Sequence, residues 1–315
     1  MGVSKRLTSL LSRCRLWILC FPVLLSPLSG DKPAVAVSIL PYQGLVERLA
    51  GDSVEVVVLV PPGAAPETFN PTPSEVRRLG RARLFFRVGV PFEARLAERL
   101  SEGAAELEVV DLRSRVRLRT IEDHDHHGEE HHHHGEDHHH DHEEVFRGVE
   151  NPDPHHWLSP RRLVSQVEQI AEYLIGLLPD QADEIRRAAR ELIQELDDLD
   201  DQVFDWLEPH EGRAFLVAHP AFGYFADDYR LRQKAIEVDG RDPSPRQLRE
   251  LVLSAREEGI QVVFVQPGFD EAAARRVAGA IGGVVMVLDP LYPDVLANIR
   301  AIAESLNQVW SRDDE

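Results

Sequence analysis

The chain has 315 residues, of which 43% are hydrophobic and 28% are charged, and its formal net charge at pH 7 is −19. This length leaves room for two domains with buried cores. The strong negative charge argues against nucleic acid as a partner and suits a protein that handles cations.

The N-terminus predicts an export signal. A positively charged stretch (Lys5 to Arg15) precedes the apolar run 16–25, which is too short to span a bilayer comfortably, and small residues lie before Asp31. We therefore expect residues 1–30 to be a cleaved signal peptide and the mature protein to be periplasmic or secreted. The alternatives are an uncleaved membrane anchor and a lipid on Cys20, although the residues before Cys20 lack the small side chains usual in lipoprotein signals.

The only two cysteines, Cys14 and Cys20, both lie in this signal segment. The mature protein would therefore contain no disulfide, and its core must be large enough to stabilise the fold alone.

From Lys32 to Asp111, short β-rich runs alternate with helical runs. The near-continuous valines of 53–60 are typical of a strand covered on both faces. This alternation predicts a parallel sheet with helices on both sides. The expected strands are 34–39, 53–60, 84–88 and 107–111, and the expected helices are 42–50, 74–81 (capped by Ser74) and 92–101.

Residues 122–144 contain only histidine, acidic residues and glycine, and they hold eleven of the fifteen histidines. Without apolar side chains this segment cannot offset the entropy of ordering, so we expect a disordered loop. Imidazoles and carboxylates predict accessory, low-affinity metal binding. The alternatives are a solvated charge run or a purification tag, but a tag is normally unbroken and terminal. The histidines are His124, His126, His127, His131, His132, His133, His134, His138, His139, His140 and His142.

Two helices follow the histidine-rich loop. The first is expected at 161–178, and the second, at about 181–208, has apolar residues at three- and four-residue steps and is long enough to run along two lobes. The strand–helix alternation then resumes. The expected strands are 214–218, 234–238, 261–265 and 284–288, and the expected helices are 224–229, 244–258 (opened by Ser244), 270–281 and 293–310.

The predicted fold class is α/β, with two lobes that are each a four-stranded parallel sheet with flanking helices, joined by one long rigid helix. The predicted organisation is a signal peptide at 1–30, an N-terminal lobe at 31–158, linking helices at 159–211 and a C-terminal lobe at 212–315.

Four metal-capable residues follow strand ends, where open parallel sheets bind ligands. They are Glu67, His155, His219 and Asp289. Two imidazoles and two carboxylates complete a coordination shell for a divalent ion. Each residue also has a simpler explanation. Glu67 and Asp289 could cap helices, His219 could bond to backbone, and His155 or its neighbour His156 could pack beside Trp157.

Six motifs of the chain resemble those of the metal-binding substrate-binding proteins of ABC transporters. The resemblance is strongest to the periplasmic zinc-uptake branch of the TroA-like family, which has a helical backbone. The resemblance covers nearly all of 35–310. The motifs are PETFNPTPSE at 66–75, PHHWLSP at 154–160, HPAFGYFA at 219–226, PSPRQL at 243–248, VQPGF at 265–269 and LDPL at 288–291.

The resemblance implies that His155, His219 and Asp289 are ligands. The family usually has a histidine directly after the first proline of the 66–75 motif, where this chain has Glu67. A set of two histidines and two carboxylates is harder and closer to that of manganese-binding relatives. Alternatively Glu67 is no ligand, and water or a loop histidine takes that position.

The implied function is capture of a divalent metal ion, Zn²⁺ in the first place and Mn²⁺ or iron as alternatives, and its delivery to an ABC permease by a monomeric protein that catalyses no reaction. The histidine-rich loop would collect metal near the cleft. Two other functions stay open, a metal store working through that loop and a zinc hydrolase. Against the hydrolase, the sequence has no HExxH or comparable catalytic motif.

Overall fold

The structure is a computed structural model that describes residues 32–101, 106–121, 152–237, 241, 243–267 and 271–313. Residues Pro33–Glu315 form one compact unit, and the fold given below is the fold of that unit. The predicted signal peptide and the predicted histidine-rich loop, residues 1–30 and 122–144, lie outside the described residues. No helix among the described residues combines the length and the apolar content needed to cross a membrane.

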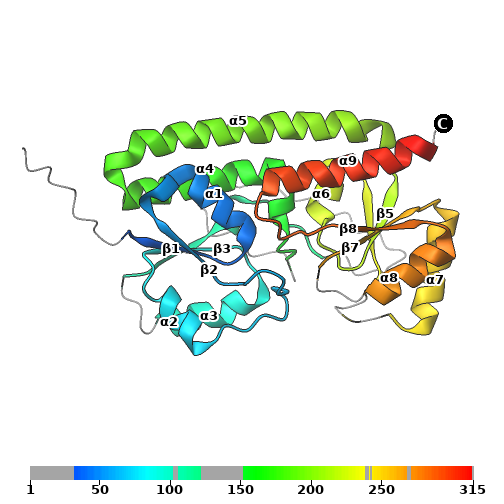
Figure 1. Cartoon of the computed structure of the whole chain (residues 1–315), viewed down its shortest axis with the longest axis horizontal. Coiled ribbons are helices and arrows are strands. Elements are labelled where there is room, and N and C mark those ends of the chain that lie inside the picture. Colours follow the sequence, from blue (N-terminus) through cyan, green and yellow to red (C-terminus); the bar gives the residue numbers. More distant parts are fainter. Residues whose placement is uncertain are drawn as a thin grey trace, which may run out of the picture. The chain divides into compact units, whose positions relative to one another are not determined.

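Two parallel sheets of four strands each form the centres of two lobes, as predicted (Figure 1). The strand order is the same in both, β2-β1-β3-β4 in the N-lobe and β6-β5-β7-β8 in the C-lobe. The N-lobe strands are β1 (Ala34–Val37), β2 (Glu55–Val58), β3 (Leu84–Arg87) and β4 (Glu108–Asp111). The C-lobe strands are β5 (Ala214–Val217), β6 (Arg232–Ala235), β7 (Val262–Val265) and β8 (Val284–Val287).

Helices cover both faces of each sheet (Figure 1). In the view of Figure 1, α1, α4 and α5 lie above the N-lobe sheet and α2 and α3 below it, while α9 lies above the C-lobe sheet and α7 and α8 below it. The helices are α1 (Leu40–Ala50), α2 (Pro73–Leu79), α3 (Pro91–Ser101), α4 (Pro160–Leu177), α5 (Ala182–Leu207), α6 (Gly223–Asp228), α7 (Pro245–Glu257), α8 (Glu271–Ile281) and α9 (Val295–Asp313).

The long linking helix is α5, which has 26 residues and packs beside α4 and α9. Its buried face, which includes Leu192, Leu196 and Val203, belongs to one apolar core that also contains Phe85 of the N-lobe sheet and Phe215 of the C-lobe sheet. Apolar burial is the main favourable contribution to folding. The two lobes therefore share a core through this helix.

One predicted helix start is wrong. The N-cap of α2 is Thr72 and not Ser74, because the Thr72 hydroxyl accepts the N–H of Glu75 at 3.3 Å while the Glu75 carboxylate accepts the N–H of Thr72 at 2.6 Å. This reciprocal capping box places Pro73 at the first helical position, where its fixed φ is favourable. In α7 the cap is Ser244, as expected, with Gln247 in the reciprocal role.

Candidate metal site

The segments that follow four strand ends meet at one small cavity between the lobes. Glu67 lies between β2 and α2, His155 follows β4, His219 lies two residues after β5, and Asp289 lies two residues after β8. All four line a cavity of about 30 Å³. The rest of the lining is Ala64, Ala65, Pro66, Trp157, Gln266, Pro267, Pro290 and Leu291. A cavity of this size accommodates a single ion rather than an organic molecule.

Three of these residues present ligand atoms to one another. Glu67 Oε1 lies 3.6 Å from His155 Nε2 and 3.6 Å from His219 Nε2, and the three ligand atoms all lie within 4.8 Å of one another. Tetrahedral zinc with bonds of about 2.0–2.2 Å separates its ligand atoms by about 3.4 Å. The observed spacing is therefore close to that of ligands around one ion.

The ring of His155 is oriented by Asp153. Its Nδ1 lies 2.7 Å from Asp153 Oδ1, and the same oxygen accepts the backbone N–H of His155 at 3.0 Å. Asp153 is completely buried. A carboxylate at Nδ1 fixes the tautomer and leaves Nε2 for a metal ion, an arrangement common among metal-binding histidines.

The ring of His219 is oriented by Glu237, whose Oε1 lies 2.5 Å from His219 Nδ1. Gln266 braces the backbone of the same residue, because its amide accepts the N–H of His219 at 3.2 Å and donates to the His219 carbonyl at 2.8 Å. His219 Nε2 therefore faces Glu67 in the same manner as His155 Nε2.

The neighbouring His156 has a structural role. Its Nε2 lies 2.9 Å from the Val88 carbonyl oxygen, and its Nδ1 lies 3.0 Å from Gln166 Nε2 and 3.3 Å from the Tyr42 hydroxyl. Both ring nitrogens are thus occupied by partners in the N-lobe and in α4, and burial lowers the pKa of His156 to about 4. This geometry distinguishes His155 from His156, which the sequence motif alone does not.

Asp289 lines the cavity but is not among the three residues whose ligand atoms cluster. Its Oδ1 accepts the N–H of Leu291 at 2.9 Å, and its carbonyl accepts from the Asn298 amide at 2.8 Å. The carboxylate is therefore fixed at the cavity wall by a local turn, and it retains a second oxygen for a further bond.

The charges at the site interact strongly. Burial opposes a charge on His155, but Asp153 and then Glu67 outweigh burial and raise the pKa of His155 to about 9. Burial also opposes the charge on Glu67, yet the nearby imidazoles of His155 and His219 hold the pKa of Glu67 below its usual value. The metal-free site thus keeps a proton on His155, which an arriving cation must displace.

Trp157 connects the two halves of the site. Its indole N–H donates to the Pro290 carbonyl at 2.8 Å, and its ring lies 5.2 Å from the ring of His155. Because Pro290 follows Asp289 in the C-lobe, this buried hydrogen bond holds the His155 segment against the loop after β8.

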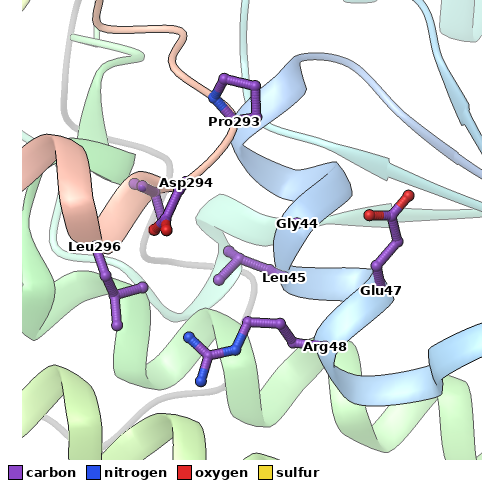
Figure 2. A pocket seen from close by; sticks show the side chains of 8 residues that line it. Gly44, Leu45, Glu47, Arg48, Pro293, Asp294 and Leu296 are labelled. Atoms are coloured by element: carbon purple, nitrogen blue, oxygen red, sulfur yellow. The ribbon is translucent and has the colours of Figure 1, made fainter.

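A larger cavity of about 410 Å³ lies between α1 and the start of α9 (Figure 2). Its charged lining residues have partners nearby. Glu47 accepts from Gln43, Arg48 donates to Glu195 at 2.5 Å, and Asp294 accepts the N–H of Ala297 at the start of α9. None of the described residues that line this cavity is a histidine, so its size does not make it the candidate metal site.

Sequence reasoning missed Asp153, Glu237 and Gln266. Two of them had an available signal. Gln266 directly follows β7, and Glu237 lies two residues after β6, so the strand-end rule that selected the ligands also applies to them. Glu237 was nevertheless assigned to a strand that was expected to reach residue 238. Asp153 lies two residues before His155 in a proline-rich stretch, and only the structure shows that its carboxylate bonds to the imidazole.

Comparisons with known proteins identify the family of the chain. The family described as zinc-uptake complex component A, periplasmic, matches residues 35–308. A Chlamydia muridarum protein, provisionally described as a metal-binding protein, is 30% identical to this chain over 275 residues. The match covers 85% of this chain and 88% of that protein. The zinc-binding protein AdcA of Streptococcus pyogenes is 26% identical over 267 residues, which are 84% of this chain but only 51% of AdcA.

Among solved structures, a crystal structure of ZnuA has a TM-score of 0.75 and 31% sequence identity, and the match covers 88% of this chain and 99% of that one. A ZnuA deletion mutant with zinc bound matches equally well, with a TM-score of 0.75, 31% identity, and coverage of 88% of this chain and 97% of that chain.

Proposed function

We propose that this chain, which belongs to the family of periplasmic zinc-uptake complex component A proteins, captures Zn²⁺ outside the cytoplasm and delivers it to the membrane permease of an ABC transporter. The family consists of solute-binding proteins of ABC transporters, and membership supports metal capture as the general role. The choice of Zn²⁺, the periplasmic location after signal cleavage, and delivery to a permease are parts of the proposal.

One observation carries the proposal. Glu67 and His155 from the N-lobe and His219 from the C-lobe present three ligand atoms within 4.8 Å of one another. Both imidazoles are already oriented through their Nδ1 atoms by carboxylates. Such preorganisation favours tight binding, because little side-chain freedom is lost when the ion arrives.

Asp289 is proposed as the fourth ligand, through the carboxylate oxygen that does not accept the Leu291 N–H. Its place in the cavity wall supports this role. Two histidines and two carboxylates form a complete shell for Zn²⁺, and the second carboxylate also makes the site acceptable to Mn²⁺. Zn²⁺ is preferred here because the similar proteins include the zinc-binding protein AdcA and a ZnuA deletion mutant with zinc bound.

The test is a competition titration with a zinc chelator of known affinity. Wild type is expected to bind one Zn²⁺ tightly, and His219→Ala and His155→Ala are expected to lose that site. Glu67→Ala measures whether the carboxylate is a ligand. His210→Gln is the control, since His210 bonds to Asn307 and packs on Trp310 outside the cavity, and glutamine can still donate to Asn307. An unchanged tight site in His219→Ala would refute the proposal.

Two rival functions are separated by simple measurements. Deleting residues 122–144 should leave one tight site if those histidines are accessory, whereas a metal store that works through them would lose tight binding. A preference for Mn²⁺ over Zn²⁺ under buffered conditions would change the cargo without changing the role. Hydrolase activity requires an open coordination position on the metal, so Zn²⁺-dependent hydrolysis that fails in His219→Ala would favour the enzyme.

A further inference from the structure

The segment just before residue 122 lies against the segment just after residue 151. Thr120 pairs with Pro152 in an antiparallel bridge, and the N–H of Asp153 donates to the Arg119 carbonyl at 2.9 Å. Arg119 is therefore the direct neighbour of Asp153, the carboxylate that orients His155.

The guanidinium of Arg119 connects that carboxylate to the C-lobe. Its Nη1 donates to Asp153 Oδ2 at 2.9 Å, and its Nε donates to Asp227 Oδ2 in α6 at 2.9 Å. The side chain of Arg119 is only 14% exposed, and the side chain of Asp153 is fully buried. A charge-assisted hydrogen bond at such low exposure is stronger and less screened by salt than a surface ion pair.

The two oxygens of Asp153 are thus divided between two tasks. Oδ1 bonds to the His155 ring at 2.7 Å, and Oδ2 bonds to Arg119 at 2.9 Å. Because the carboxylate has no access to solvent and the arginine is always charged, Arg119 holds the carboxylate in one orientation from the Oδ2 side. Tyr224 of α6 strengthens the arrangement, since its hydroxyl accepts the Arg119 N–H at 3.2 Å and donates to the Asp153 carbonyl at 2.9 Å.

Gly223, the first residue of α6, provides the space for the guanidinium. A Cβ at this position would lie 1.7 Å from Arg119 Nη1, 2.5 Å from Arg119 Cζ and 3.0 Å from Asp153 Oδ2. Gly223 is helical and is not among the glycines with positive φ, so its backbone does not require glycine. The requirement comes from the closeness of the arginine.

We infer that Arg119 is a positioning residue for metal capture, which acts through Asp153 on the orientation of His155 and for which Gly223 leaves the necessary room. The inference rests on the proposed function, since it concerns how one ligand of that site is held. Arg119 itself is not among the residues that line the cavity.

Two different substitutions can disrupt the same hydrogen bond between Arg119 and Asp153. Arg119→Ala removes the cation, while Gly223→Ala keeps every charge and displaces the guanidinium. Each is expected to weaken Zn²⁺ binding by about tenfold, the lower end of the range for residues that orient metal ligands. The double variant should bind about as weakly as Arg119→Ala alone, because the two close contacts of the added Cβ, at 1.7 and 2.5 Å, are both with the Arg119 guanidinium, and only the contact of 3.0 Å with Asp153 Oδ2 remains. Independent effects would instead multiply.

Two readouts separate positioning from a loss of folding. Zn²⁺ affinity is measured by chelator competition on the full chain, and the visible absorption band of bound Co²⁺ reports ligand geometry in the folded protein. The band should shift in Arg119→Ala and Gly223→Ala. Arg119→Lys should restore part of the affinity, since lysine keeps the charge but cannot donate to Asp153 and Asp227 through a rigid fork.

Matched controls come from the same chain. Gly279→Ala adds a methyl group in helix α8 where nothing lies within 4 Å, and Arg115→Ala removes an arginine of the preceding segment that is paired with Glu172 at 2.6 Å on the surface. Both should retain the wild-type affinity and Co²⁺ spectrum.

The inference is overturned if Arg119→Ala and Gly223→Ala bind Zn²⁺ like wild type, if their losses multiply in the double variant, or if Gly279→Ala loses as much. These outcomes differ from failure of the proposed function, because if the proposed function were wrong, wild type would bind Zn²⁺ no more tightly than His219→Ala. If Arg119→Ala does not fold, Gly223→Ala and Arg119→Lys decide the question with all charges present.

Discussion

The N-lobe and C-lobe halves of the metal site present their histidines alike but support them differently. In each half a carboxylate holds Nδ1 and Nε2 points to Glu67 Oε1 at 3.6 Å. Behind His155 lies Asp153, fully buried and bonded to Arg119. Behind His219 lies Glu237, whose side chain is 15% exposed, with Gln266 bracing the backbone.

The same orientation of a metal-binding histidine is therefore stabilised in two different ways in the two lobes. The N-lobe half depends on a buried charge that must stay paired, because an unpaired buried charge is costly. The C-lobe half depends more on backbone hydrogen bonds, which do not change with charge. We therefore expect the N-lobe half to be more sensitive to protonation and to loss of a single carboxylate.

The largest expected effect is that of pH. Since the pKa of His155 in the metal-free protein is raised to about 9, the ring carries a proton below that pH, and Zn²⁺ must displace it. Apparent affinity should therefore rise at least about tenfold per pH unit up to about pH 9, or at least about 100-fold between pH 6 and pH 8. Titration calorimetry in buffers of different ionisation enthalpy should show proton release near pH 7.5.

The same shift has a consequence for metal-free stability, with a definite sign. The pKa of His155 in the folded protein lies above its ordinary value of 6.5, so the stabilising contribution of the charged ring is complete below about pH 6.5 and is lost as pH rises through about 9. A Zn²⁺ affinity that does not change between pH 6 and pH 8 would contradict both expectations. The N-lobe half of the site would then be no more sensitive to protonation than the C-lobe half.

The next largest effect is expected from Asp153→Asn. Asparagine can still accept from the His155 ring, but it leaves Arg119 without its buried carboxylate, so Zn²⁺ affinity should fall by about 100-fold. The number of protons released on binding at pH 7.5 should fall as well. Asp200→Asn is the control, since Asp200 also pairs with an arginine, Arg161, but does not line the cavity. Equal losses in both variants would mean a general effect on folding.

A smaller effect is expected from Glu237→Gln, because Gln266 still holds the backbone of His219 and a glutamine oxygen can accept from its ring. The expected loss of Zn²⁺ affinity is about tenfold. Glu258→Gln removes an ion-paired carboxylate from the same lobe and should have no effect on affinity. If Glu237→Gln weakened binding more than Asp153→Asn, the proposed difference between the two halves would be wrong.

Much of the fold could be predicted because its patterns are local. The valines of β2 indicated a covered strand, and the apolar steps of α5 indicated a helix along a shared core. The strand-end rule then selected Glu67, His155, His219 and Asp289, and the structure places all four around one cavity. That they bind metal stays a prediction, and so do the domain boundaries and the role of the loop histidines.

The residues behind the ligands could not be predicted in the same way, because their roles depend on contacts between distant segments. Arg119 acts on Asp153 across 34 positions, and Gly223 makes room for it from the other lobe. Neither has a periodic pattern or a metal-binding side chain. The capping of α2 was misjudged for a related reason, since Thr72 and Ser74 are both good caps and only the bond to Glu75 decides between them.

The smallest effect on metal binding is expected from Glu93, a buried N-lobe carboxylate at the start of α3. It accepts from the Ser38 hydroxyl and from the N–H groups of Val88 and Gly89, and burial raises its pKa from 4.5 to about 7 despite these bonds. It does not line the metal cavity.

Between pH 4.5 and about 7, Glu93 is ionised in the unfolded chain but protonated in the folded one. Its contribution to stability is therefore complete below pH 4.5 and is lost as pH rises through about 7, at up to about 1.4 kcal/mol per pH unit. Glu93→Gln should remove this slope from the free energy of unfolding measured in denaturant titrations, while Zn²⁺ affinity changes less than in Glu237→Gln. Parallel stability curves for wild type and Glu93→Gln would show that Glu93 is ionised in the folded state, and the N-lobe would then contain one more buried charge that its neighbours must stabilise.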